Sequence, residues 1–226
     1  MFDQLVIGNI GTDDNFGATV SSRAIKDPPK KKITKTVPFS NQTYDFSKIN
    51  GELYWGQREL DYEFEMIASC YEELEEMKIN FSNFIMNVFE DEIHDPFIPD
   101  YHFKGTFESK EYDDDESGLK TTVKVKFMAY PYKISNRQKK YTSPAPVLAP
   151  KIVTVHNTSG HRIIPTITII GDVRIIYGNI SYAASNETVH DELFSLNPGV
   201  NKYSIQGIGE NGEPCSIEIC FHEEVF

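Results

Sequence analysis

The sequence has few cysteines, no long apolar run and no signal-peptide pattern. Its 226 residues include three cysteines, Cys70, Cys215 and Cys220, and an odd number cannot all pair within one chain, so a disulfide scaffold is not indicated. No apolar run approaches the roughly 20 residues that span a bilayer. Residues 1–9 lack the basic and apolar regions of a signal peptide. We therefore expect a chain that stays in the cytoplasm where it is made and has no membrane partner.

Basic residues are scarce relative to acidic ones. The chain has 22 Lys and Arg against 34 Asp and Glu, a formal net charge of −12. Residues 1–135 carry most of the imbalance, with 15 basic and 25 acidic side chains, whereas residues 136–226 have 7 and 9. An acidic surface gains nothing from counterion release on a phosphate backbone. Nucleic acid is therefore not an expected partner.

Motifs that carry catalysis are also missing. The sequence has no serine nucleophile elbow, phosphate loop, paired CxxC motif or HExxH motif. His156, His161, His190 and His222 fall on four different segments, which the sequence alone cannot bring together. We therefore expect no enzyme and no cofactor, which leaves binding or assembly.

Two acidic clusters contain the residue types that bind metal ions. Asp91-Glu92 and His94-Asp95 come just past a predicted helix, without a second His–carboxylate pair at ligand spacing, so they are interpreted as solvated charge. Asp113 to Glu116 lacks the spaced glycine and the closing glutamate of a calcium loop, so it is interpreted as a hairpin tip. No metal site is predicted.

The clearest structural pattern begins at Arg58. From Arg58 to Ala68, apolar and acidic residues alternate, which is the period of a half-buried strand. A helix is predicted next, because Ser69 and Glu72 have the spacing of a capping box. Six apolar residues then recur at three- and four-residue spacing and form one stripe: Leu74, Met77, Phe81, Phe84, Ile85 and Val88.

Two further strands, Tyr101 to Tyr112 and Leu119 to Tyr130, are predicted to complete a sheet on which this helix packs. The chain before Arg58 is less regular. Residues 8–17 are rich in glycine and aspartate and are predicted to turn. The segment Lys26 to Lys35 contains Pro28-Pro29 followed by Lys30, Lys31 and Lys32.

The prolines and the like charges of this segment predict an exposed loop or arm. A solvated loop is the simpler interpretation. The alternative is an arm whose lysines contact an acidic neighbouring surface, such as another copy of the chain. Trp55, the only tryptophan, is interpreted as a core or interface residue, with sugar stacking as the alternative.

A domain boundary is predicted where the periodicity stops. Residues 136–150 contain Pro144, Pro146 and Pro150 and are predicted to form a stiff linker. Beyond it, short β-branched runs separated by turn signals predict an all-β sandwich. The predicted fold is mainly β (α+β): an N-terminal antiparallel sheet or sandwich with one packed helix at 1–135, and a C-terminal sandwich at 151–226.

Many short stretches resemble the distal tail protein (Dit) family of siphophages and prophages of Gram-positive bacteria. In the first half they are Val37-Pro38-Phe39, Asn41 to Ser47, Tyr54, Arg58-Glu59-Leu60, Tyr62 to Met66, the helix to Val88, Phe103 to Phe107 and Phe127 to Tyr132. In the second half they are Val155 to Gly160, Pro165 to Ile169 with Gly171, Leu196 to Gly199 with Asn201, and Ile217 to Glu223. Their order and spacing carry the resemblance.

The resemblance implies a structural virion protein of the tail tip, assembled in the host cytoplasm. In that family the first domain forms a homohexameric ring, and the second is a galectin-like β-sandwich. The ring is a baseplate hub that joins the major tail (tube) protein and the tape measure protein to the tail-associated tip protein and the receptor-binding protein. Lys30, Lys31 and Lys32 are then candidate residues of the oligomer or tube interface.

A carbohydrate-binding module that contacts the host wall through the C-terminal sandwich is the alternative, and a hydrolase with scattered residues is a third. Sugar-binding galectins use a His-Asn-Arg set with a stacking tryptophan. His156-Asn157 and Arg162 repeat part of that set, but Trp55 belongs to the other domain. We therefore expect the galectin likeness to concern the fold alone.

Overall fold

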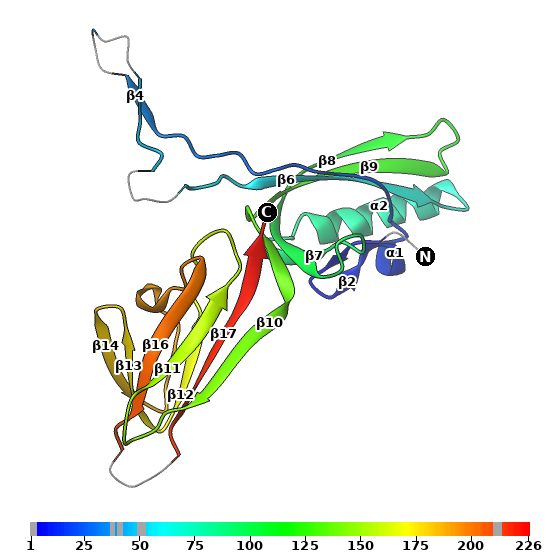
Figure 1. Cartoon of the computed structure of the whole chain (residues 1–226). Helices are drawn as coiled ribbons and strands as arrows, with labels where there is room; N and C mark the ends of the chain where they lie inside the picture. The colour runs from blue at the N-terminus through cyan, green and yellow to red at the C-terminus, as the bar shows by residue number, and fades with distance from the viewer. Residues whose placement is uncertain (1–3, 37–38, 40–42, 49–52, 210–213) are drawn as a thin grey trace. The chain divides into compact units, whose positions relative to one another are not determined.

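A computed structural model describes residues 4–36, 39, 43–48, 53–209 and 214–226. The chain divides into two compact units, Met1–Lys133 with Phe226, and Ile134–Val225. Strands in antiparallel sheets dominate both units (Figure 1), as the alternating patterns predict. None of the helices in the described part of the chain combines the length and the apolar character needed to cross a bilayer.

The first unit is a curved antiparallel sheet with two helices, α1 and α2, against it (Figure 1). Strand β6 pairs with β3 and β9, β9 pairs with β8, and the sheet continues from β8 through β7 and β1 to β2. Its elements are β1 (Val6–Ile7), β2 (Ile10–Gly11), α1 (Thr12–Phe16), β3 (Thr19–Ile25), β6 (Arg58–Ile67), α2 (Tyr71–Ile85), β7 (Asp91–His94), β8 (Tyr101–Asp114) and β9 (Lys120–Ala129). A separate two-stranded sheet is formed by β4 (Thr34–Thr36) and β5 (Thr43–Asp45).

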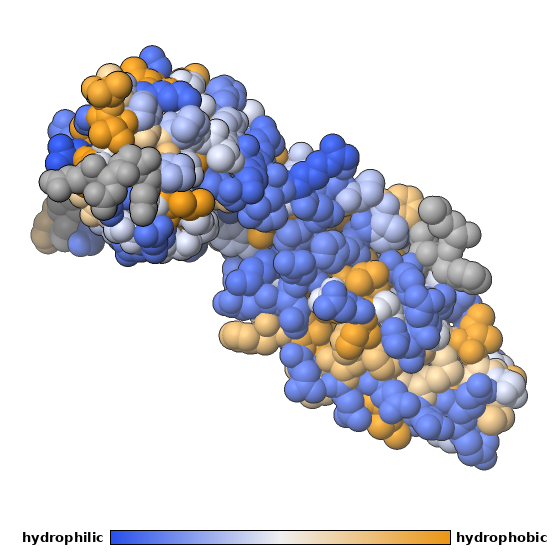
Figure 2. Space-filling view, turned by 90° about the horizontal axis from the view of Figure 1, so that it is seen from below, coloured by the Kyte–Doolittle hydropathy of each residue, from blue (hydrophilic) through white to orange (hydrophobic). Residues whose placement is uncertain are grey.

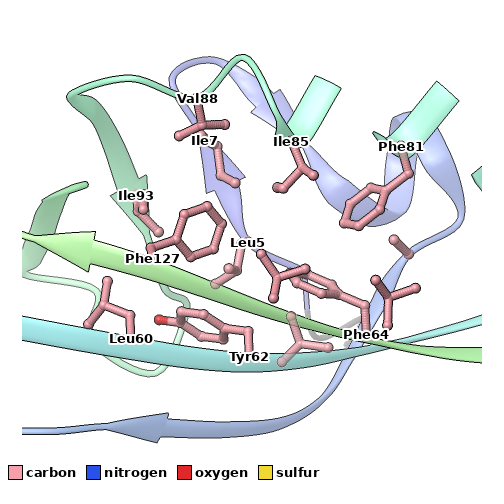
Figure 3. Packing of buried hydrophobic residues seen from close by; sticks show 14 of the residues in the cluster. Leu5, Ile7, Leu60, Tyr62, Phe64, Phe81, Ile85, Val88, Ile93 and Phe127 are labelled. Atoms are coloured by element: carbon pink, nitrogen blue, oxygen red, sulfur yellow. The ribbon is translucent and has the colours of Figure 1, made fainter. Parts of the chain in front are cut away.

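The predicted alternation in β6 is confirmed. Leu60, Tyr62 and Phe64 are at most 1% exposed, and the acidic residues between them lie on the opposite face of the sheet. In the register with β9, Leu60 lies opposite Phe127 and Phe64 opposite Val123. Figure 3 shows Leu60, Phe64 and Phe127 in the core together with residues of β1 and α2.

The helical stripe is also confirmed, but the helix ends are not as predicted. Phe81 is fully buried, with its ring centroid 5.2 Å from that of Phe64. The helix ends at Ile85 rather than Val88, and its N-cap is Cys70. The predicted capping box is wrong by one residue, because the Ser69 amide donates to Glu73 (2.8 Å) rather than to Glu72.

Helix α1 was not predicted. Its five residues lie in the passage expected to be turns, and they are too few to give a periodic pattern. Phe16, its last residue, stacks on Phe84 of α2 at 4.8 Å between ring centroids and so joins the same core. Gly17 follows at a φ of 62°, the left-handed conformation common after a helix.

The second unit is the predicted all-β sandwich. One sheet has the order β15, β12, β17, β10, and the other β11, β16, β13, β14, with an apolar cluster between them. Its elements are β10 (Lys133–Pro144), β11 (Lys151–Asn157), β12 (Thr166–Ile170), β13 (Asp172–Tyr177), β14 (Ile180–Ser185), β15 (Thr188–Val189), the 3-10 turn η1 (Glu192–Phe194), β16 (Gly199–Gly207) and β17 (Ser216–Val225).

Strand β10 occupies most of the segment predicted to be a linker. Its ladder is compatible with the prolines because Pro144 is its last residue and Pro146 and Pro150 come after it. Tyr141 of β10 stacks on Phe221 of β17, with ring centroids 6.2 Å apart. The side chains of β10 are mostly exposed or half-exposed and alternate only weakly. This is why the sequence pattern indicates a linker rather than a strand.

Several predicted features lie outside the described residues. These are parts of two stretches that carry the resemblance, Val37-Pro38-Phe39 and Asn41 to Ser47. Before β6, Trp55 forms one isolated bridge with Lys30, and the strand itself begins at Arg58, as predicted.

Candidate assembly and binding surfaces

The sheet of the first unit has a charged face opposite the helices. Lys26 Nζ lies 2.6 Å from Glu59 Oε2 and 3.0 Å from Asp61 Oδ2. Lys126 Nζ lies 3.4 Å from the same Glu59 oxygen. Hydrogen bonds from Lys26 and then Lys126 lower the pKa of the Glu59 carboxyl below its ordinary value of 4.5. Much of the acidic charge on this face is therefore matched within the unit.

The predicted basic arm is a two-stranded ribbon. At its base the Lys31 amide donates to the Tyr54 carbonyl (2.9 Å), and the Gly56 amide donates to the Pro29 carbonyl (2.7 Å). Farther along it, strand β4 pairs antiparallel with β5. The backbone pairing gives the arm a defined path, which the sequence did not predict.

The three candidate lysines are all exposed, but the structure does not bring them together. Lys30 Nζ lies 5.4 Å from the ring centroid of Trp55, and Lys31 lines a cleft at the base of the arm. Asp45 of β5 has a lowered pKa because Ser47 hydrogen-bonds to it and, to a smaller extent, because Lys32 is near. Lys30 thus lies near Trp55, Lys32 lies near Asp45, and Lys31 lines the cleft.

The cleft beside Lys31 has a volume of about 340 Å³ and a mixed lining. Its residues are Lys31, Trp55, Gln57, Glu90, Lys104, Thr106, Met128, Tyr130 and Pro131. Lys104 and Glu90 form an ion pair across 3.0 Å. The Trp55 ring is half-buried and packs edge-on against Phe226 at 4.7 Å. These contacts agree with the interpretation of Trp55 as a core or interface residue.

Large apolar side chains are also exposed on the first unit. At and beyond the C-terminal half of α2, Ile79, Met86 and Phe89 are 57%, 59% and 72% exposed. Figure 2 shows one face of the molecule, on which apolar residues gather in separate patches among hydrophilic ones. Exposed apolar patches of this kind are typical of surfaces that contact other proteins.

One member of the partial galectin set in the second unit, Asn157, is engaged within the protein. The Asn157 side chain is buried, and its amide donates to the carbonyls of His161 (3.0 Å) and Leu196 (2.9 Å). The Ser159 backbone amide donates to Oδ1 of the Asn157 side chain (2.9 Å). Asn157 is therefore used to hold the loop after β11, while His156 and Arg162 are exposed on either side of that loop.

The interpretation of residues 91–95 as solvated charge past a helix is wrong. Residues Asp91–His94 form strand β7, and Asp95 is 2% exposed. The structure brings His102 of β8 next to Glu92 and His94, with ligand atoms within 4.8 Å of one another. The sequence offered no signal for His102, because the pairing of β7 with β8 across the proline-containing turn was not predicted.

No family model matches the sequence, and no curated protein sequence matches it. Among solved structures, the whole chain is similar to the crystal structure of the phage SPP1 Dit (gp 19.1) protein, described as a paradigm of the hub adsorption apparatus in Gram-positive infecting phages. The TM-score is 0.68, and the match covers 100% of both chains. The chain has the Dit fold. Because only 14% of residues are identical, the likeness concerns the fold, and the Dit resemblance of the sequence is confirmed at that level.

Proposed function

We propose that this chain is a structural protein of a phage tail, the distal tail hub at the tail tip. The observation that carries the proposal is the full-length match of both units, in order, to the Dit fold. A shared single domain would be weak support, because one fold hosts many functions. Two different units in the same order over the whole length are a more specific likeness.

The proposed assembly is a homohexameric ring built by the first unit. Its projecting arm and its exposed apolar residues, including Phe89, supply surfaces for a neighbouring subunit. The sandwich has its own apolar cluster. The ring would join the tail tube and tape measure proteins to the tail-associated tip protein and to a receptor-binding protein.

Native mass spectrometry tests the ring directly. We expect a species of about six times the chain mass of 25.8 kDa, either from the chain alone or with tail-tube protein present. Negative-stain images of the same sample should show closed rings. A chain that stays monomeric in both conditions contradicts the proposal.

The carbohydrate-binding alternative has less support, because Asn157 is occupied by backbone groups and Trp55 is in the first unit. We expect no glycan to bind the full chain on an array of cell-wall saccharides. Binding that persists in Trp55→Ala but is lost in an Arg162→Ala variant would favour the alternative.

A further inference from the structure

The pairing of β7 with β8 brings two histidines and a glutamate onto one face. The register between the two strands pairs Glu92 with Lys104 and Ile93 with Phe103. One step farther along, the same antiparallel register places His94 opposite His102, and their ring centroids are 5.0 Å apart. Because side chains alternate along a strand, Glu92, His94 and His102 share the face opposite Ile93 and Phe103.

The distances between their ligand atoms suit one metal ion. His94 Nε2 lies 3.2 Å from Glu92 Oε2, and His102 Nε2 lies 3.9 Å from Glu92 Oε1. All three ligand atoms are within 4.8 Å of one another. Two ligands about 2.0–2.1 Å from a tetrahedral zinc ion are roughly 3.4 Å apart. Small side-chain rotations would therefore bring the set to coordinating distances.

We propose that Glu92, His94 and His102 bind one divalent transition-metal ion of the zinc type. Two imidazole nitrogens and one carboxylate suit Zn²⁺ and Co²⁺, whereas Mg²⁺ and Ca²⁺ prefer all-oxygen sets. Three protein ligands leave a fourth position for water or for a ligand from another molecule. His102 is 7% exposed, whereas Glu92 is exposed, so the ion reaches the site from solvent and is held against the sheet.

The lysine opposite Glu92 has its own acidic partner. Lys104, which lies opposite Glu92 in the register, is paired with Glu90 at 3.0 Å. The ion would bind between adjacent strands and tie β7 to β8. Strand β7 lies between β8 and β1 in the sheet. Metal binding would therefore stabilise the edge of the sheet that carries β1 and β2, independently of any role in a phage tail.

The test uses the full chain without a histidine tag, in a Cys70→Ser background because Cys70 is an exposed free thiol. Isothermal titration with ZnCl₂ measures the affinity and the number of ions bound. We expect one ion per chain in this parent. We expect His94→Gln and Glu92→Gln each to weaken binding at least about tenfold, since even residues behind the ligands are worth 10–100-fold.

His156→Gln is the matched control, because it makes the same chemical change at an exposed histidine of the second unit. It should bind zinc like the parent. Co²⁺ titration gives a second readout, since a four-coordinate site produces visible absorption that His94→Gln should remove. Zinc binding of equal strength in His94→Gln, Glu92→Gln and the parent, or no binding by the parent, would overturn the proposal.

Discussion

At the scale of single residues, Asp95 determines how the turn after β7 is held. The Tyr62 hydroxyl donates to Asp95 Oδ2 (3.1 Å), and the Phe97 amide donates to Oδ1 (2.9 Å). Arg23 Nε lies 3.5 Å from Oδ2, and the Arg23 guanidinium lies 3.6 Å from the centroid of the Phe97 ring. Burial, and then the Asp95 charge, raise the pKa of Tyr62, which keeps its hydroxyl protonated as a donor. Each oxygen of this buried carboxylate thus accepts a hydrogen bond, and Oδ2 also lies near a guanidinium.

Removing the Asp95 carboxylate should destabilise the fold. We expect Asp95→Ala to lower the free energy of unfolding by about 3 kcal/mol, because it removes the acceptor of the buried Tyr62 hydroxyl and the ion pair that Asp95 forms with Arg23. Asp95→Asn should cost less, since it keeps an oxygen acceptor and the side-chain volume. Urea denaturation of the three proteins measures the difference. An Asp95→Ala protein as stable as the parent would mean that the pairing contributes nothing net.

The aromatic core gives a second prediction at this scale. Phe81 is fully buried between Phe16 and Phe64, so Phe81→Ala should destabilise the first unit by about 3–5 kcal/mol. Glu76→Ala, on the exposed side of the same helix, is the matched control and should change stability by less than about 0.5 kcal/mol. Denaturant unfolding followed by far-UV circular dichroism compares them. Equal costs would show that the apolar stripe does not face the core.

At the scale of elements, the periodicity of apolar residues predicts the strands and the helix that bury one face. Strand β6, the stripe of α2, and Val123, Val125 and Phe127 of β9 were found because burial repeats along them. Helix α1 is too short to show a helical period of apolar residues, and the side chains of β10 are mostly exposed or half-exposed. The Glu92, His94 and His102 cluster depends on the pairing of two strands. Such pairing is a tertiary feature that spacing along the chain does not specify.

Strand β10 also contributes ion pairs, which predicts a dependence on pH. Lys139 Nζ lies 2.6 Å from Glu223 Oε1. Burial raises the pKa of Glu223, but the bonds from Lys139 and Thr158 outweigh it, so the pKa lies below its ordinary 4.5. A carboxyl whose pKa is lowered by folding stabilises the fold above the unfolded-state pKa, and this stabilisation is lost as pH falls through the folded-state pKa.

We therefore expect the stability of the parent to fall as pH drops below 4.5, and Glu223→Gln to reduce this acid dependence. The variant should lose up to about 1 kcal/mol at pH 7, because Lys139 is partly exposed and screened by solvent. Urea midpoints at pH 7 and at lower pH values measure both effects. Parallel pH profiles for the two proteins would exclude a contribution from this pair.

At the scale of the whole molecule, β10 changes where the second unit begins. The sequence places the sandwich at 151–226, whereas the compact unit is Ile134–Val225 and includes β10 next to β17. We expect a fragment of residues 134–225 to unfold cooperatively. A fragment of residues 151–225 should be less stable, because β17 would lose its pairing with β10 and the Tyr141–Phe221 contact. Heat denaturation followed by circular dichroism separates them, and equal melting temperatures would show that β10 is dispensable.

The proposed ring predicts a second effect at this scale, from the charge of the arm. Residues 1–135 carry 25 acidic and 15 basic side chains, so neighbouring copies in a ring repel unless opposite charges meet. Lys31 and Lys32 are exposed and can supply such charges, whereas Lys30 also lies over Trp55. Lys31→Glu with Lys32→Glu therefore tests the electrostatics and leaves the Lys30–Trp55 contact in place.

We expect this double variant to weaken the hexamer or its docking to tail-tube protein. Each exposed ion pair is worth about 0–1 kcal/mol, but a ring repeats the change in every subunit. The effect should shrink as added salt shortens the screening length below the roughly 8 Å of physiological ionic strength. Lys151→Glu with Lys202→Glu, an equal charge change at exposed positions of the sandwich, should assemble like the parent. Native mass spectrometry and tube co-sedimentation across a salt series compare the three proteins. If both double variants assemble and dock equally well, the arm is a solvated ribbon and apolar surfaces alone build the ring.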